Sequence, residues 1–102
     1  EPVRAAFLEL RDKILALEGV TERANQKSQI TYRTTKSFAA FDFRKALVFC
    51  QFKGGDKLRG PAERAKDIRS YNWGYQWACE LKSMVDINPV FELIRGAYEF
   101  EL

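Results

Sequence analysis

One spacing in the sequence could support metal-dependent hydrolysis, namely Asp67 followed by Glu80-Leu81-Lys82. Restriction-type nucleases bring an Asp and a Glu-x-Lys together at a sheet edge, where the carboxylates hold Mg²⁺ and the lysine stabilises charge near the phosphate. Residues 80 and 82 point to the same face of a strand, as that chemistry requires. A solvated pair of opposite charges has the same spacing, however, and Asp67 follows no evident strand. We therefore expect a domain that is not an enzyme, with a magnesium-dependent nuclease as the alternative.

The residue types that are rare in the chain exclude other chemistries. It has no histidine among its 102 residues, which excludes Ser-His and Cys-His nucleophiles and histidine-based metal sites. Its two cysteines, Cys50 and Cys79, are too few for a disulfide framework or a zinc site. Both lie in apolar, strand-like runs, which predicts buried free thiols in a reducing cytoplasm. No run approaches the roughly 20 apolar residues of a membrane span. We assign no catalytic residue, metal ion or cofactor, and expect no membrane partner.

Positive charge gathers in the middle of the sequence. The segment from Arg23 to Arg69 holds twelve basic and four acidic residues, a net charge of +8, in a chain whose net charge is +3. Basic and aromatic residues interleave there, and a turn with two further aromatic residues follows. Basic side chains can neutralise phosphates and exposed rings can stack on bases. The candidate nucleic-acid-binding residues are Arg33, Lys36, Arg44, Lys45, Lys53, Arg69, Tyr71 and Trp73. The alternative is that these cations only solvate turns and protect sheet edges.

The periodicity of apolar residues predicts the elements that must position these side chains. Residues 2–18 have helical spacing and end at Gly19, which suits a left-handed cap. Short β-like segments follow at 28–34, 37–43 and 46–53, then a short helix within 62–68, a strand over 75–82 and an amphipathic helix over 86–99. The order is α-β-β-β-(short α)-β-α. It predicts an α+β fold, a four-stranded antiparallel sheet with the N- and C-terminal helices packed on one face.

The predicted strands differ in whether one face or both faces carry apolar residues. In the strand over 75–82, Tyr75, Trp77, Cys79 and Leu81 should face the core. They alternate with a more polar set, namely Gln76, Ala78, Glu80 and Lys82. The segments 37–43 and 46–53 instead carry apolar residues on both faces, Phe38 and Phe49 among them. A sheet that is covered on one face only does not need such strands. We therefore expect the second face to be covered by residues 54–69 or by another domain or subunit.

Several stretches resemble an uncharacterised prokaryotic family often labelled "predicted transport protein", the domain of unknown function 5655. Its members have a similar helix ending in ILALD, a YIAYKT-x-x-NF hairpin, an ARDV…HWG turn and a closing VLELIRQAYE. The matching stretches here are FLELRDKILALEGV, SQITYRTTKSFAAFDFRKALVFCQF, GPAERAKDIRSYNWG and FELIRGAYE. After Trp73-Gly74 this chain has Tyr75-Gln76-Trp77 where the family usually has Gly-Asn-Gly-Asp. The resemblance implies an accessory domain and supplies no catalytic residue.

These observations together predict one domain over residues 1–102. Because the chain begins with Glu1 rather than Met, and because the resemblance implies an accessory role, we expect a C-terminal part of a longer polypeptide. Its expected function is that of a non-catalytic accessory or protein-interaction domain. The partners would be other domains of the parent polypeptide or a second copy. The alternative is a module that binds DNA or RNA through its basic surface, attached to a nuclease or restriction-type protein.

Overall fold

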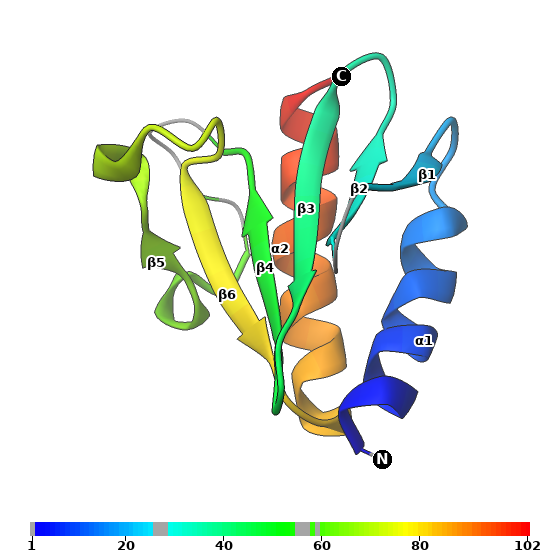
Figure 1. Ribbon diagram of the computed structural model, residues 1–102. Coiled ribbons are helices and arrows are strands. Elements are labelled where there is room, and N and C mark those ends of the chain that lie inside the picture. Colours follow the sequence, from blue (N-terminus) through cyan, green and yellow to red (C-terminus); the bar gives the residue numbers. More distant parts are fainter. Residues whose placement is uncertain (1, 26–28, 55–57, 59) are drawn as a thin grey trace.

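A computed structural model describes residues 2–25, 29–54, 58 and 60–102. Figure 1 shows one twisted antiparallel sheet, with the C-terminal helix behind its central strands and the N-terminal helix to one side of them. Neither of these helices is long and apolar enough to cross a membrane. The helices and strands are α1 (Pro2–Leu15), β1 (Thr21–Ala24), β2 (Gln29–Arg33), β3 (Ser37–Phe43), β4 (Val48–Phe52), β5 (Lys66–Asp67), β6 (Trp77–Leu81) and α2 (Ile87–Phe100). Single 3₁₀ turns lie at η1 (Ala62–Arg64), η2 (Arg69–Tyr71) and η3 (Met84–Asp86).

The sheet has six strands in the order β1-β2-β3-β4-β6-β5, and all neighbours are antiparallel. The α+β class and the two helices on one face are as predicted, but the prediction of four strands is wrong. The two additional strands lie at the sheet edges and are short and largely exposed, with the sequences TERA and KD. Such strands have no apolar alternation, because little of their surface is buried. Their pairing partners, and not their own sequences, make them strands.

The ends of several elements also differ from the prediction. Helix α1 ends at Leu15, and a turn with Gly19 at φ +80° follows it. The segment expected to be a short helix divides into the η1 turn and strand β5. Strand β6 begins at Trp77, so Tyr75 lies outside it. The phenol of Tyr75 is 2.6 Å from the hydroxyl of Ser37 on β3, on the sheet face away from the helices, and the expectation that Tyr75 faces the core is wrong.

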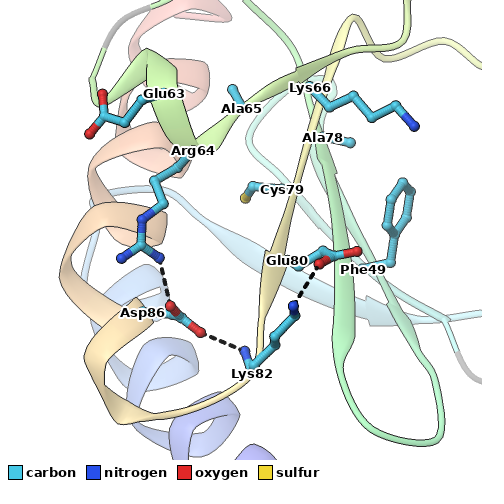
Figure 2. A pocket seen from close by; sticks show the side chains of 10 residues that line it. All are labelled: Phe49, Glu63, Arg64, Ala65, Lys66, Ala78, Cys79, Glu80, Lys82 and Asp86. Carbon is cyan, nitrogen blue, oxygen red and sulfur yellow. Dashed lines mark hydrogen bonds and ion pairs between the residues drawn. The ribbon is translucent and has the colours of Figure 1, made fainter.

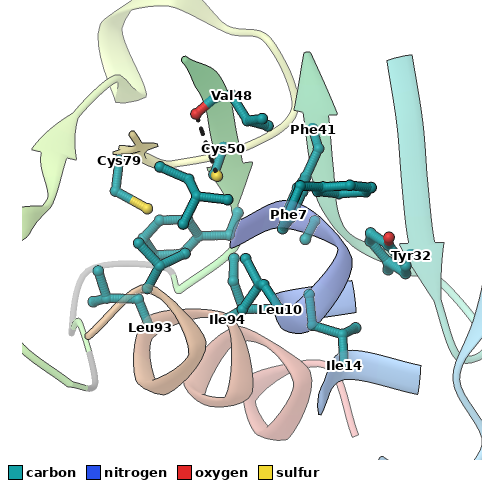
Figure 3. Packing of buried hydrophobic residues seen from close by; sticks show 14 of the residues in the cluster. Phe7, Leu10, Ile14, Tyr32, Phe41, Val48, Cys50, Cys79, Leu93 and Ile94 are labelled. Carbon is teal, nitrogen blue, oxygen red and sulfur yellow. Dashed lines mark hydrogen bonds between the residues drawn. The ribbon is translucent and has the colours of Figure 1, made fainter. Parts of the chain in front are cut away.

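The hydrophobic core fills the space between the sheet and the two helices (Figure 3). Phe7 of α1 meets Phe41 of β3 edge to face, with ring centroids 5.9 Å apart. Cys50 and Cys79 are buried neighbours on β4 and β6, and both are free thiols. Burial raises the pKa of the Cys50 thiol. Trp77 lies on the same side and packs against the core, but it is only half-buried.

A β-bulge changes which face of the sheet Phe38 occupies. Tyr32 pairs with Ala39 while Arg33 pairs with Ser37, which leaves Phe38 as the additional residue on β3. Phe38 is fully buried, and its ring meets that of Tyr98 of α2 with centroids 5.7 Å apart. The expectation of a second apolar face is therefore wrong at this residue. The bulge transfers Phe38 to the helix side, whereas Phe49 remains on the face where it was expected.

Strand β1 is attached to α1 by a three-residue polar cluster. The Arg11 guanidinium donates two hydrogen bonds of 2.7 and 2.8 Å to the Glu22 carboxylate. The phenol of Tyr32, whose side chain is fully buried, donates to the same carboxylate at 2.8 Å. The Arg11 hydrogen bond lowers the pKa of Glu22, whereas burial and the Glu22 carboxylate raise the pKa of Tyr32. This cluster gives a polar edge strand a fixed position against the helix layer.

Candidate functional site

The sheet face opposite the helices presents two rows of side chains that run across the strands. Because successive residues of a strand alternate between faces, the strand register defines these rows. One row contains Thr31, Ala40, Gln51 and Ala78, of which the last three are buried, and the next contains Gln29, Asp42, Phe49 and Glu80. We call this surface the open face. The loop between β5 and β6 carries Trp73 and Tyr75 to it.

A polar network forms the floor of a shallow pocket of about 470 Å³ on the open face. Asp42 accepts a hydrogen bond from the Gln29 amide at 3.0 Å and another from the Gln51 amide at 2.9 Å. Gln29 in turn accepts from the Asn25 amide at 2.9 Å. Three neighbouring strands thus contribute one polar side chain each. A carboxylate with two amide donors still has lone pairs available, so Asp42 can accept further hydrogen bonds from a ligand.

Aromatic side chains form one wall of the pocket. The rings of Tyr71 and Trp73 are stacked, with centroids 4.7 Å apart and an angle of 18° between their planes. Each of these residues is 51% exposed. The residue between them, Asn72, has φ +56°, a left-handed conformation that asparagine tolerates better than most residues. This turn presents a pair of rings to solvent beside the polar floor.

Arg44 lines the pocket together with Trp73 and Tyr75. It follows β3 directly, in the tight hairpin that leads to β4. Its guanidinium carbon is 4.3 Å from the centroid of the Phe49 ring, a cation–π contact that keeps the charge on the open face. The pocket therefore combines a flat ring surface, hydrogen-bond acceptors and a cation.

The structure brings together only some of the residues that the sequence predicted to bind nucleic acid. Arg44 and Trp73 line the pocket, and Tyr71 stacks on Trp73. Lys45 is exposed in the same hairpin turn as Arg44. Lys36 is exposed in the β2–β3 turn, at the other end of β3.

The other basic residues that were predicted to bind nucleic acid make contacts within the protein. Lys53 is 3.9 Å from the carboxylate of Glu101, beyond the end of α2. Arg69 forms hydrogen bonds of 3.0 and 2.8 Å to the two carboxylate oxygens of Asp67. Arg33 donates to the main-chain oxygen of Thr35 at 2.8 Å. These three side chains are less available to a ligand than Arg44, Lys36 and Lys45.

The nominated carboxylates of a nuclease do not converge. Register pairs Asp67 with Trp77, whose side chain faces the helix layer, while Glu80 belongs to the open face. Glu80 instead lies 3.3 Å from the Lys82 ammonium, at the rim of a second pocket of about 500 Å³. Figure 2 shows this ion pair beside the contacts that Asp86 makes with Arg64 and with the main chain of Lys82. In the ranges described above, no three His, Cys, Asp or Glu residues are grouped in a way that could hold a metal ion.

Sequence reasoning missed four residues of the pocket, namely Gln29, Asp42, Gln51 and Tyr75. One local signal was present. Asp42 stands between Phe41 and Phe43 in an apolar strand, and Gln51 interrupts another such strand. A polar residue within a strand of that kind is expected to have a specific partner. The partner could not be named, since the register that aligns the two residues depends on tertiary structure.

The described residues define a class of protein, an α+β sandwich with one helix-covered face and a second face that carries a polar network. The chain belongs to the family described as "Domain of unknown function (DUF5655)", whose model matches residues 1–101. This confirms the family suggested by the sequence motifs, while the label "predicted transport protein" gains no support from the match. No curated protein and no solved structure matches the chain.

Proposed function

We propose that this domain is a non-catalytic accessory module that binds single-stranded nucleic acid on its open face. The observation that carries the proposal is the exposed Trp73 ring, stacked on Tyr71, beside the Arg44 guanidinium and the Asp42 network. Proteins that bind single strands combine rings that stack on bases with cations that follow the phosphates. A base within a duplex offers no free ring face, so the stacked pair favours an unpaired strand.

The distribution of charge supports the same ligand. By strand alternation, Arg23 and Lys66 lie on the open face together with the carboxylates Asp42 and Glu80, and Arg44 lies there over Phe49. Arg33 is on the same face, although it also donates to the main-chain oxygen of Thr35. Asp42 accepts two amide hydrogen bonds, and Glu80 is paired with Lys82. The excess of basic side chains follows the strands across the sheet. Because these cations are spread over several strands, a polyanion can contact more than one of them, whereas a small anion cannot.

Binding to a fluorescein-labelled oligothymidine of 11 nucleotides tests this proposal. We expect dissociation constants on the order of 10⁻⁴–10⁻⁶ M and a steep loss of affinity with salt. Trp73→Ala should weaken binding about tenfold, since stacking contributes about 1–3 kcal/mol per base. Arg44→Gln should lower the slope of log affinity against log salt by about 1.

Matched controls lie on the helix layer. Phe100→Ala removes an aromatic residue that is 46% exposed at the end of α2, and Arg95→Gln removes an exposed arginine of that helix. Neither change should alter the affinity or its salt dependence. An absence of binding at about 50 mM salt, where phosphate contacts are strong, would contradict the proposal.

An apolar groove favours protein interaction as a second candidate function. It has a volume of about 380 Å³ and lies between α1 and the β3–β4 hairpin, with Leu8, Phe43 and Val48 among its lining residues. Leu8 is 47% exposed there, and exposed apolar surface of this kind marks contact sites.

A second copy of the chain is the partner that this candidate implies and that is simplest to test. We expect sedimentation velocity to show a concentration-dependent dimer that Leu8→Asp abolishes. Leu102→Asp, at a residue that is 78% exposed and lies outside the groove, is the matched control. A chain that stays monomeric at every concentration would leave the groove without this role.

A further inference from the structure

We infer that the pocket on the open face selects guanine among the bases of a bound strand. The inference rests on the proposed function and adds a base preference to it. The base preference is inferred from the hydrogen-bond acceptors on the pocket floor. Neither stacking on a base nor contact with a phosphate requires such acceptors. Stacking and phosphate contacts give little sequence preference, so a preference must come from hydrogen bonds to a base edge.

The floor offers hydrogen-bond acceptors to a ligand. The Gln29 amide group donates to one oxygen of the Asp42 carboxylate and the Gln51 amide group to the other, and each oxygen has a further lone pair. The carboxylate accepts only, so it fixes the orientation of both amides.

The amide oxygen of Gln51 is a second acceptor. Its NH₂ group donates to Asp42, which directs its oxygen elsewhere. Among the residues that the structure describes, no side chain donates to this oxygen, and no buried side-chain oxygen lacks a partner. Gln51 as a whole is only 8% exposed, but this oxygen keeps some accessible surface, and Gln51 lines the pocket. Asp42 and Gln51 present two neighbouring acceptors beside the Trp73 ring.

Guanine has the matching arrangement of donors. Its N1–H and its 2-amino group lie side by side on the Watson–Crick edge, so a carboxylate or a pair of neighbouring acceptors can receive both. Cytosine and adenine each place a single amino group beside a ring nitrogen that is itself an acceptor. Thymine and uracil place one N–H between two carbonyl oxygens, which the floor would repel. Single-stranded nucleic acid exposes this edge, whereas a duplex occupies it with the pairing base.

Arg44 adds a donor to the same pocket, over the Phe49 ring that pairs with Asp42 in the sheet. Arginine is the residue that most often recognises the O6 and N7 acceptors of guanine. The guanidinium is positioned by its contact with the Phe49 ring and lines the same pocket as Asp42. The pocket therefore holds acceptors that suit the donor edge of a guanine stacked on Trp73, and a cation that suits its O6 and N7 atoms.

The test compares labelled 11-nucleotide strands of thymidine that carry one central guanine, hypoxanthine or cytosine, together with the all-thymidine strand. Hypoxanthine lacks only the 2-amino group of guanine. We expect the guanine strand to bind at least about tenfold more tightly than the other three, as a two-donor base contact implies. Asp42→Asn should remove this preference, because one floor acceptor becomes a donor. Glu80→Gln changes a carboxylate in the same row outside the pocket and should keep the preference.

Gln51→Met provides a second variant in case Asp42→Asn does not fold, which thermal unfolding will show. Equal binding of all four strands would overturn the guanine inference and leave the proposed function intact. Binding of none would overturn both. If free dGMP binds as tightly as the guanine strand, the guanine inference is supported but the single-strand function is wrong. A preference that persists in both floor variants would overturn the role given to Asp42 and Gln51.

Discussion

Replacing Phe41 with alanine is expected to lower the free energy of unfolding by about 3–5 kcal/mol, the range measured when a buried phenylalanine is truncated. Phe41 is fully buried in the middle of β3. Its ring lies between Phe7 of α1 and Tyr32 of β2, with centroids 5.9 and 5.3 Å away. The substitution leaves a cavity where the helix layer meets the sheet, and neither neighbouring ring can fill it without leaving its own site.

Phe49→Ala provides the matched control for Phe41→Ala. Phe49 lies on β4, but its half-buried side chain faces the open side beneath Arg44. We expect a loss of about 1 kcal/mol, because no closed cavity forms there. Chemical denaturation of the two variants measures the difference. Equal losses would contradict the assignment of one covered and one open face.

Replacing Asp86 with asparagine is expected to lower the free energy of unfolding by about 2 kcal/mol at neutral pH, since hydrogen bonds to a charged group contribute about 1.5–3 kcal/mol. Its carboxylate accepts from the main-chain N–H groups of Lys82 and Ser83 at 2.8 and 3.1 Å, and from Arg64 at 2.6 Å. These contacts close the η3 turn at the start of α2 and attach the η1 turn to it. The Arg64 side chain is 40% exposed, so solvent screens that ion pair and most of the loss comes from the main-chain contacts.

The effect of Asp86→Asn should depend on pH. Burial opposes the charge on Asp86, but the hydrogen bonds from Lys82, Arg64 and Ser83 outweigh it, so the pKa lies below its usual value. A carboxylate with a lowered folded-state pKa contributes stability above its unfolded-state pKa of about 3.9 and loses it as pH falls through the folded-state pKa. The difference between wild type and Asp86→Asn should therefore be full at pH 7 and shrink below about pH 4.

Urea denaturation at pH 7, 5, 4 and 3 measures this difference. Asp12→Asn, at an exposed residue of α1, is the control and should change stability by less than about 0.5 kcal/mol at each pH. A difference that stays constant down to pH 3 would show that the Asp86 charge does not contribute in this way.

The layered fold could be predicted from the sequence because its main elements bury surface in a periodic way. Helix α2 places apolar residues at helical spacing, and β3 was predicted at the bounds that the structure gives it, Ser37–Phe43. The short connections around Lys36 and Lys45 predicted antiparallel neighbours, as observed. The edge strands could not be predicted in this way, since TERA and KD bury little and form strands only because β2 and β6 offer partners.

The candidate site, like the fold, could be predicted from the sequence only in part. Local composition alone indicated Arg44, Tyr71 and Trp73, because aromatic and basic residues are conspicuous in turns. Register decided the rest. It aligns Gln29, Asp42 and Gln51 across three strands, where each could donate to or accept from the next.

The sequence by itself determined the α+β class, the covered face of the sheet and the family, since these depend on the periodicity of apolar residues and on extended similarity. Tertiary structure alone decided that a bulge moves Phe38 into the core, that Tyr75 lies over the opposite face, and that Asp42 becomes the centre of a polar pocket. The physical reason is that a shift of one residue in pairing exchanges the two faces of a strand. Such a shift is fixed by contacts between segments distant in sequence, which no local pattern contains.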